Sequence, residues 1–174
     1  MLACAVSLAL SPMLRAQPVS GSHEFVPAGK PAGKARLRFW GLDVYDASLW
    51  IAPGFRRSDF SSHAFALQLQ YLRGFSGADI ARRSIDEMRL EGGFSAGLAA
   101  AWQSELARLL PDVHTGDRLT GINRPGRPTL FLLNGRPLGE IADGQFARLF
   151  FGIWLGPKTS EPAMRDALLA GTPQ

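Results

Sequence analysis

Few residues of this 174-residue chain have both the type and the spacing that chemistry requires. The three histidines, His23, His63 and His114, lie far apart, and none stands at metal-ligand spacing from another ligand. The sequence contains no nucleophile elbow, no phosphate-binding glycine loop and no dinucleotide-binding fingerprint. These observations argue against a hydrolase, kinase or dehydrogenase of a recognisable type. They also give no reason to expect a metal or another cofactor.

The N-terminal segment is typical of a secretory signal peptide. Residues 2–10 form an apolar run, Pro12 follows, and the small residue Ala16 marks a cleavage position. Cleavage there would remove Cys4, the single cysteine, and leave a mature protein without thiols or disulfides. The alternative is an ordinary buried first helix. We expect a signal peptide over 1–16, a flexible leader over 17–34, one domain over 35–172 and a periplasmic location.

The composition is that of an ordinary globular domain, with 46% hydrophobic and 20% charged residues. The formal net charge is +4, and the arginines are spread along the chain, so no nucleic-acid-binding patch is indicated. The apolar N-terminal run is too short to span a bilayer. The composition does not indicate an oligomeric state.

Alternating apolar residues predict a mostly antiparallel sheet. Residues 37–51 are rich in aromatic residues, and we expect one central strand with a bulge or bend at Gly41. In this alternation Asp43 and Tyr45 share one face, and Arg38 lies on the other. Further strands are expected at 65–71, 117–122, 129–133 and 136–141, and Asn134-Gly135 is a strong hairpin signal.

Helical spacing predicts two pairs of helices between and after these strands. The first pair begins at Ser76 and at residue 96, and the second pair follows Asp143 and Ser160 as capping residues. The order of strands, two helices, strands and two helices indicates an α+β fold with helices against one face of the sheet.

Two segments together resemble the bacterial, exported branch of the chalcone isomerase-like proteins. They read L-R-F-W-G-L-D-V-Y-D-A-S-L-W at 37–50 and F-F-G-I-W-L-G-P-K-T-S-E-P at 150–162. The resemblance covers residues 33–170 and implies a large curved antiparallel sheet, helices on one face and an apolar cleft between the layers. The plant enzymes of the family cyclise a chalcone, and another branch with this fold binds fatty acids without catalysis.

The matched positions argue against isomerase activity. The threonine that helps to polarise the substrate carbonyl in the plant enzymes falls at Trp40, and their helix tyrosine falls near Asp79 or Ile80. Thr159 and Ser160 match a region where those enzymes use a hydroxyl, but helix capping explains both residues more simply.

The fatty-acid-binding branch implies an arginine and a tyrosine that hold a carboxylate. A guanidinium suits that role because a charge-assisted hydrogen bond offsets the desolvation of the anion. Tyrosines are more often core residues, however, and Arg38 and Arg73 are more often solvated or paired with Asp43 and Asp46. The candidate ligand-binding residues are Arg36, Arg38, Tyr45, Tyr71 and Arg73.

We therefore expect a non-catalytic binder of a small apolar or amphipathic carboxylate, with the ligand in a cleft between sheet and helices. Two alternatives stay open: a protein-interaction module of the cell envelope, and an intramolecular lyase of the chalcone isomerase type. Convergence of Arg38, Tyr45, Tyr71 and Arg73 on one closed apolar cavity would favour binding. A filled core would favour the interaction module.

Overall fold

The computed structural model describes residue 26 and residues 28–173, so the expected signal peptide and most of the expected leader lie outside the described residues. The strands are β1 (Lys30–Phe39), β2 (Leu42–Ile51), β3 (Phe65–Tyr71), β4 (Arg118–Asn123), β5 (Thr129–Leu133) and β6 (Arg136–Ile141). The helices are the 3-10 helix η2 (Arg57–Ser62) and the α-helices α1 (Gly77–Glu91), α2 (Ala96–Leu109), α3 (Gly144–Leu155) and α4 (Pro162–Leu168).

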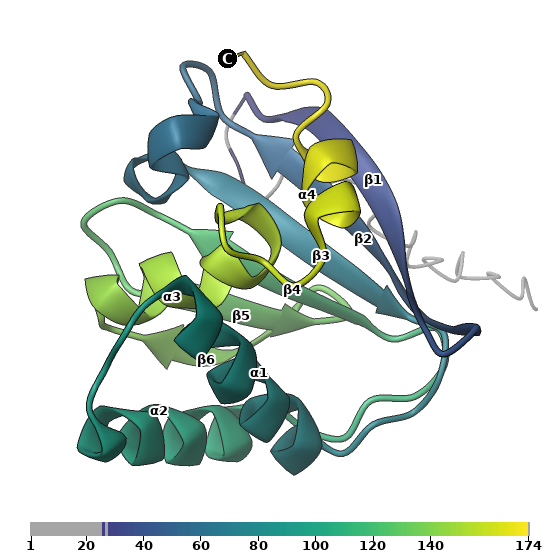
Figure 1. Cartoon of the computed structure of the whole chain (residues 1–174), viewed down its shortest axis with the longest axis vertical. Helices are drawn as coiled ribbons and strands as arrows, with labels where there is room; N and C mark the ends of the chain where they lie inside the picture. The colour runs from purple at the N-terminus through teal and green to yellow at the C-terminus, as the bar shows by residue number, and fades with distance from the viewer. Residues whose placement is uncertain (1–25, 27, 174) are drawn as a thin grey trace, which may run out of the picture.

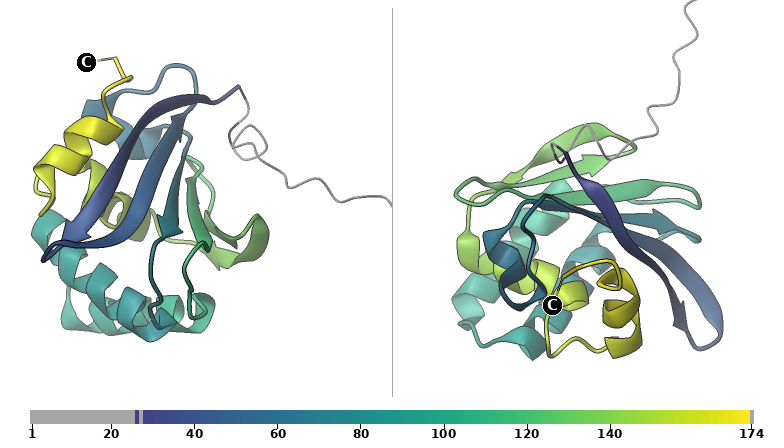
Figure 2. Two further views of the ribbon diagram at one scale, coloured as in Figure 1. Left: turned by 90° about the vertical axis from the view of Figure 1, so that its right-hand side faces the viewer. Right: turned by 90° about the horizontal axis from the view of Figure 1, so that it is seen from above.

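The strands form one antiparallel sheet in chain order, from β1 at one edge to β6 at the other. The helices pack against one face, as both views in Figure 2 show. We call this the inner face and the opposite one the outer face. The predicted α+β architecture is confirmed.

The predicted central strand over 37–51 is wrong, because the chain reverses in the middle of it. Trp40 and Gly41 connect β1 and β2 with φ angles of 50° and 76°, and Phe39 pairs with Leu42. Positive φ at both central residues defines a tight type I′ hairpin turn. Such turns favour Asn-Gly, so Trp-Gly carried no recognisable signal. β1 also begins at Lys30, inside the segment expected to be a flexible leader.

A bulge lies next to this turn and preserves the alternation that suggested a single strand. Leu37 pairs with Tyr45, whereas Arg38 pairs with Asp43, so Val44 is the extra residue. A two-residue turn alone would put Leu37 and Tyr45 on opposite faces of the sheet. The extra residue of the bulge returns them to the same face. Leu37 and Tyr45 therefore still share the inner face.

Most other predicted elements are confirmed, together with the caps of α1 and α3. Ser76 accepts a hydrogen bond from the amide of Asp79 at the start of α1, and Asp143 accepts two amide hydrogen bonds at the start of α3. The turn Asn134-Gly135 connects β5 and β6 as expected. The expected loop before β3 contains the short helix η2.

The core lies between the inner face and the helices, and aromatic residues dominate it. Phe65 of β3 and Phe151 of α3 meet edge to face with ring centroids 4.7 Å apart. At the edge strand, α4 lies so close that a Cβ on Gly33 would be 2.1 Å from the carbonyl oxygen of Ala167. Only glycine fits there, which lets α4 cover the inner side of β1 (Figure 1).

Candidate functional site

The two predicted tyrosines meet on the inner face. Tyr45 of β2 and Tyr71 of β3 pair across the strands, and their rings make an edge contact with centroids 6.0 Å apart. The indole Nε1 of Trp154, on α3, donates a hydrogen bond of 2.9 Å to the hydroxyl of Tyr45. The hydroxyl of Tyr71 makes no hydrogen bond with any described residue. Both strands and a helix therefore position this cluster.

Burial keeps both phenols neutral. Desolvation raises the pKa of Tyr45 and of Tyr71 well above the ordinary value of 10.0. At neutral pH each hydroxyl can take part in hydrogen bonds, but neither is a phenolate base. This cluster can orient a polar group without carrying out acid–base chemistry.

The two arginines of β1 lie on the outer face, away from the tyrosines. Arg36 forms a fork to Asp46, with Nε–Oδ1 at 2.6 Å and the second hydrogen bond at 2.8 Å. Arg38 Nε lies 2.7 Å from Asp43 Oδ1, and Arg36 also reaches Asp43. The alternative reading of Arg38 as a partner of Asp43 is confirmed.

These ion pairs lower the pKa of both carboxyls. For Asp43 the hydrogen bond from Arg38 is the main cause, and for Asp46 it is the hydrogen bond from Arg36. Asp43 reaches the outer face because the bulge at Val44 shifts the alternation of β2. The alternation in the sequence had predicted Asp43 on the same face as Tyr45. This prediction is wrong because the bulge at Val44 separates the two residues onto opposite faces.

Arg73 lies half-buried in the loop between β3 and α1. Its guanidinium makes no hydrogen bond or ion pair with the residues that the structure describes, and so it has no polar contact with Tyr45 or Tyr71. The five candidate residues therefore do not converge on one site. Tyr45 and Tyr71 meet, Arg36 and Arg38 form a separate ion-pair group, and Arg73 joins neither by a polar contact.

The space between the sheet and α3 is filled. It retains a cavity of only about 10 Å³, lined by leucines of β3 and β4, Phe131, and the α3 residues Phe150, Phe151 and Trp154. That volume corresponds to about one water-sized sphere and leaves no room for an alkyl chain. In this structure the expected apolar cleft is packed with aromatic side chains.

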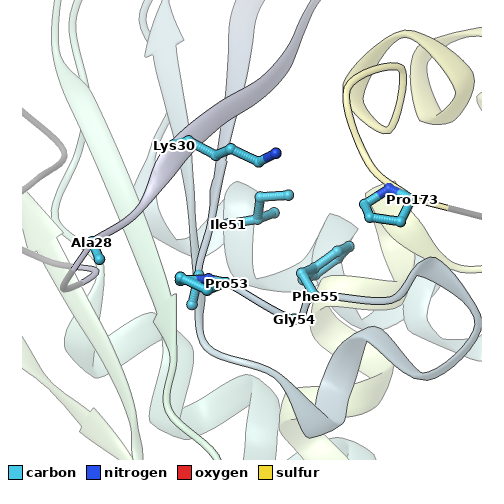
Figure 3. Close-up of a pocket in the computed structure, with 8 residues that line it drawn as sticks. Ala28, Lys30, Ile51, Pro53, Gly54, Phe55 and Pro173 are labelled. Carbon is cyan, nitrogen blue, oxygen red and sulfur yellow. The ribbon is translucent and has the colours of Figure 1, made fainter.

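A larger hollow lies at the opposite end of β1 and β2, where the sequence had suggested nothing. Its volume is about 280 Å³, and it is lined by Ala28, Lys30, Ile51, Ala52, Pro53, Gly54, Phe55 and Pro173. Figure 3 shows the Lys30 side chain extending over Ile51 toward Pro173. The wall combines two strand ends, a loop and the C-terminal tail, so no local sequence pattern could have revealed it.

The distinctive C-terminal segment has a structural role. Glu91 of α1 accepts a hydrogen bond of 2.8 Å from the amide of Lys158, and a Cβ on Gly156 would be 2.1 Å from its carboxylate. Burial raises the pKa of this Glu91 carboxyl. Ser160 donates a hydrogen bond of 2.8 Å to Glu87, which also pairs with Arg83. This segment therefore fastens the α3–α4 loop to α1.

The positions matched to the plant enzymes do not assemble a carbonyl-polarising site. Trp40 lies in an exposed turn, and Asp79 lies at the exposed start of α1, paired with Arg82. The hydroxyl of Thr159 donates to the carbonyl of Ile153 and accepts from the amide of Glu161. Neither Thr159 nor Ser160 caps α4, whose N-cap is Glu161 without a side-chain cap hydrogen bond, so that interpretation is wrong; Thr159 instead binds a carbonyl near the end of α3.

The described residues also give two general results. None of their helices is long and apolar enough to cross a membrane. Within residue 26 and residues 28–173, no group of three or more His, Cys, Asp or Glu side chains is arranged to hold a metal ion.

A six-stranded antiparallel sheet with helices on one face, and a closing segment fastened to α1, define a known class of fold. The family model described as chalcone isomerase-like matches residues 32–170, and the chain belongs to that family.

Two known proteins are similar to this chain. An uncharacterized protein of Haemophilus influenzae is 26% identical over 146 residues, which cover 82% of this chain and 69% of that protein. The crystal structure of a fatty-acid binding protein of Arabidopsis thaliana matches with a TM-score of 0.62 and 12% identity. That match covers 82% of this chain and 87% of the plant chain, and at this identity it shows the shared fold.

Proposed function

We propose that this protein is a non-catalytic binder of a small amphipathic carboxylate, such as a short fatty acid. The observation that carries the proposal is the open hollow of about 280 Å³ beside Lys30. Lys30 supplies the one charged side chain among the residues that line the hollow, and the others are Ala, Ile, Pro, Gly and Phe, a combination that suits an alkyl chain with an anionic head. The fold shared with a plant fatty-acid binding protein supports the same class of ligand.

The size of the hollow selects short ligands. Pockets for drug-sized molecules span roughly 300–1,000 Å³, and this hollow of about 280 Å³ lies just below that range. The exposed side chains of Pro53 and Pro173 can cover a short chain, while Lys30 approaches the carboxylate. Ile51 and Phe55 are almost completely buried and close the floor of the hollow.

The tyrosine cluster is the competing location for the same function. A ligand there would have to displace Trp154, which donates a hydrogen bond to Tyr45, because the space between the sheet and α3 is filled. Binding of a carboxylate by Tyr71 or Arg73 stays a prediction. It differs from the Lys30 site in needing a rearrangement of α3.

Native mass spectrometry of the delipidated full chain, titrated with octanoate and laurate, tests the proposal. We expect one bound carboxylate, with octanoate preferred, and a loss of affinity of about tenfold in Lys30→Ala. Lys34→Ala is the matched control, because Lys34 is an exposed lysine of the same strand outside the hollow. Tyr71→Phe removes only a hydroxyl without a hydrogen-bond partner among the described residues.

Each result decides between the locations. Loss of uptake in Lys30→Ala alone supports the hollow, and loss in Tyr71→Phe alone moves the ligand to the tyrosine cluster. If wild-type protein takes up neither acid, the binding function is wrong. The filled interior would then favour the second candidate, a protein-interaction module, which affinity purification with a cross-linker would test.

The location in the cell is also part of the proposal. The apolar run at 2–10 and the small residue Ala16 support export to the periplasm through a cleaved signal peptide. N-terminal sequencing of the protein recovered from separate periplasmic and cytoplasmic fractions of the native cell tests this directly. A mature chain that begins after Ala16 supports export, whereas an intact N-terminus recovered from the cytoplasm contradicts it.

A further inference from the structure

The turn between β1 and β2 presents a cluster of bare apolar side chains, which we call the aromatic tip: Phe39, Trp40 and Leu42. Their exposed fractions are 54%, 90% and 50%, and the rings of Phe39 and Trp40 stack with centroids 5.9 Å apart. Figure 1 shows this turn at the right-hand extreme of the described chain, beyond the helices. Large apolar side chains gathered at a projecting end usually mark a contact surface.

The backbone makes Trp40 an unexpected residue for its position. Its φ of 50° lies in the left-handed region, which is uncommon for bulky side chains and is better suited to Asn or Gly. An indole that is 90% exposed gains little from packing in return. A residue that is unfavourable for the backbone and contributes little to packing is a candidate for a role other than folding, such as binding.

The size and chemistry of the aromatic tip favour a membrane surface over a protein partner. The three side chains expose on the order of 400 Å² of apolar area, about half of what one partner buries in a standard protein interface. The tip lies at the end of a projecting hairpin (Figure 1). Tryptophan and its neighbours suit the boundary between lipid headgroups and acyl chains, where one end of the ring meets water.

A cation lies beside the tip. Arg38 uses Nε for Asp43, and its two terminal nitrogens make no hydrogen bond with the described residues. The side chain is 67% exposed, so these nitrogens can reach a phosphate while the pair with Asp43 persists. Lys34 and Arg36 lie further along the same strand, and Asp43 and Asp46 balance two of the three positive charges.

We propose that the aromatic tip docks the protein on a phospholipid bilayer, with Trp40 inserted at the headgroup boundary and Arg38 at a lipid phosphate. This inference does not rest on the proposed carboxylate ligand, because it uses neither the hollow nor the tyrosine cluster. It gives the protein a peripheral, reversible contact with a membrane, of the kind that a few interfacial side chains provide.

Tryptophan fluorescence with vesicles tests the proposal on the full chain. The vesicles contain equal parts of phosphatidylethanolamine and phosphatidylglycerol, with a parallel set that carries brominated acyl chains. Trp102 and Trp154 are buried and Trp50 is partly covered, so quenching by bromine reports mainly on Trp40. We expect a blue shift on adding vesicles and strong quenching by the brominated lipid.

Trp40→Asn separates docking from folding, because asparagine suits the turn better. We expect a vesicle affinity lower by at least about tenfold, measured by co-sedimentation, together with an unchanged or higher melting temperature. Leu42→Ala should weaken binding less. Leu90→Ala is the matched control, because Leu90 is 49% exposed on α1, close to the 50% of Leu42.

Four outcomes would overturn the proposal. Wild-type protein that does not sediment with vesicles contradicts it, and so does a Trp40→Asn variant that binds as well as the wild type. A blue shift that depends on protein concentration without lipid would instead identify the aromatic tip as a contact between protein molecules. A lower melting temperature in Trp40→Asn would assign Trp40 a structural role.

Discussion

Two hairpins of the same sheet close with the same backbone turn but use different residues to do so. Asn134 and Gly135 connect β5 and β6 with φ angles of 52° and 81°, close to the 50° and 76° of Trp40 and Gly41. The Asn134 side chain accepts a hydrogen bond from the amide of Arg118 and donates one to Asp117. The Trp40 side chain stacks only on its exposed neighbour Phe39.

The difference shows how one backbone geometry can serve two purposes. At β5–β6 the Asn134 side chain binds the start of β4, Arg118, and the preceding residue Asp117, so the local choice supports the fold. At β1–β2 the turn residue works against local preference and remains in water. A local conflict of this kind is expected where function, not folding, selects the residue.

The largest effect should come from placing the β1–β2 turn residue in the other hairpin. Asn134→Trp removes two side-chain hydrogen bonds, each worth about 1 kcal/mol, and puts an unsuitable residue at positive φ. We expect the free energy of unfolding in urea to fall by about 2–3 kcal/mol. A loss under about 1 kcal/mol would mean that the Asn134 hydrogen bonds contribute little and that the comparison fails.

The two glycines should behave alike, which tests whether the turns are equivalent. Gly41→Val and Gly135→Val each put a β-branched residue at positive φ, and an added Cβ at either position would meet no atom within 4 Å. The cost is therefore that of the backbone, about 1–2 kcal/mol each by urea unfolding. Gly93→Val, also in open space and without a positive φ, is the control and should cost less.

The smallest expected effect on stability comes from the charge of two carboxylates, Asp46 and Asp117. The pKa of Asp46 is lowered mainly by Arg36, and that of Asp117 mainly by the neutral amide of Asn134. Both carboxylates stabilise the fold above the ordinary value of 3.8, and this stabilisation is lost as the pH falls through each lower folded pKa.

The salt dependence of stability should differ between the carboxylates of the two hairpins. Melting temperatures from about pH 6 down to about pH 2 should fall less in Asp46→Asn and in Asp117→Asn than in the wild type. High salt should reduce the contribution of Asp46 more than that of Asp117, because Asp46 pairs with the guanidinium of Arg36 at 2.6 Å, whereas Asp117 is held mainly by the neutral amide of Asn134 and lies 3.6 Å from the His114 ring. Equal salt sensitivity at both positions would contradict this assignment.

Much of the fold could be predicted from local patterns. Alternation identified β3, the three C-terminal strands and the Asn134-Gly135 hairpin, and the capping residues Ser76 and Asp143 identified the starts of α1 and α3. These signals act between residues close in the sequence, where hydrogen bonds and side-chain periodicity are set by the chain itself.

The candidate site was less accessible to the same reasoning. The alternation correctly put Arg38 and Tyr45 on opposite faces of the sheet, an arrangement that does not favour their convergence on one ligand. It also put Asp43 on the same face as Tyr45, which is wrong. The bulge at Val44 moved Asp43 to the arginines, and a bulge depends on the pairing of two strands. No sequence signal pointed to Lys30, because the hollow forms only where β1, the loop after β2 and the C-terminal tail meet.

The sequence by itself determined the class of fold, the order of its elements after β2 and the Asn134-Gly135 turn. The tertiary structure alone decided that the space between sheet and helices is filled, that the open hollow lies at the far end, and that Trp40 projects into water. The physical reason is that periodicity fixes which face a side chain occupies. Cavities and exposed surfaces depend instead on how elements far apart in the chain pack together.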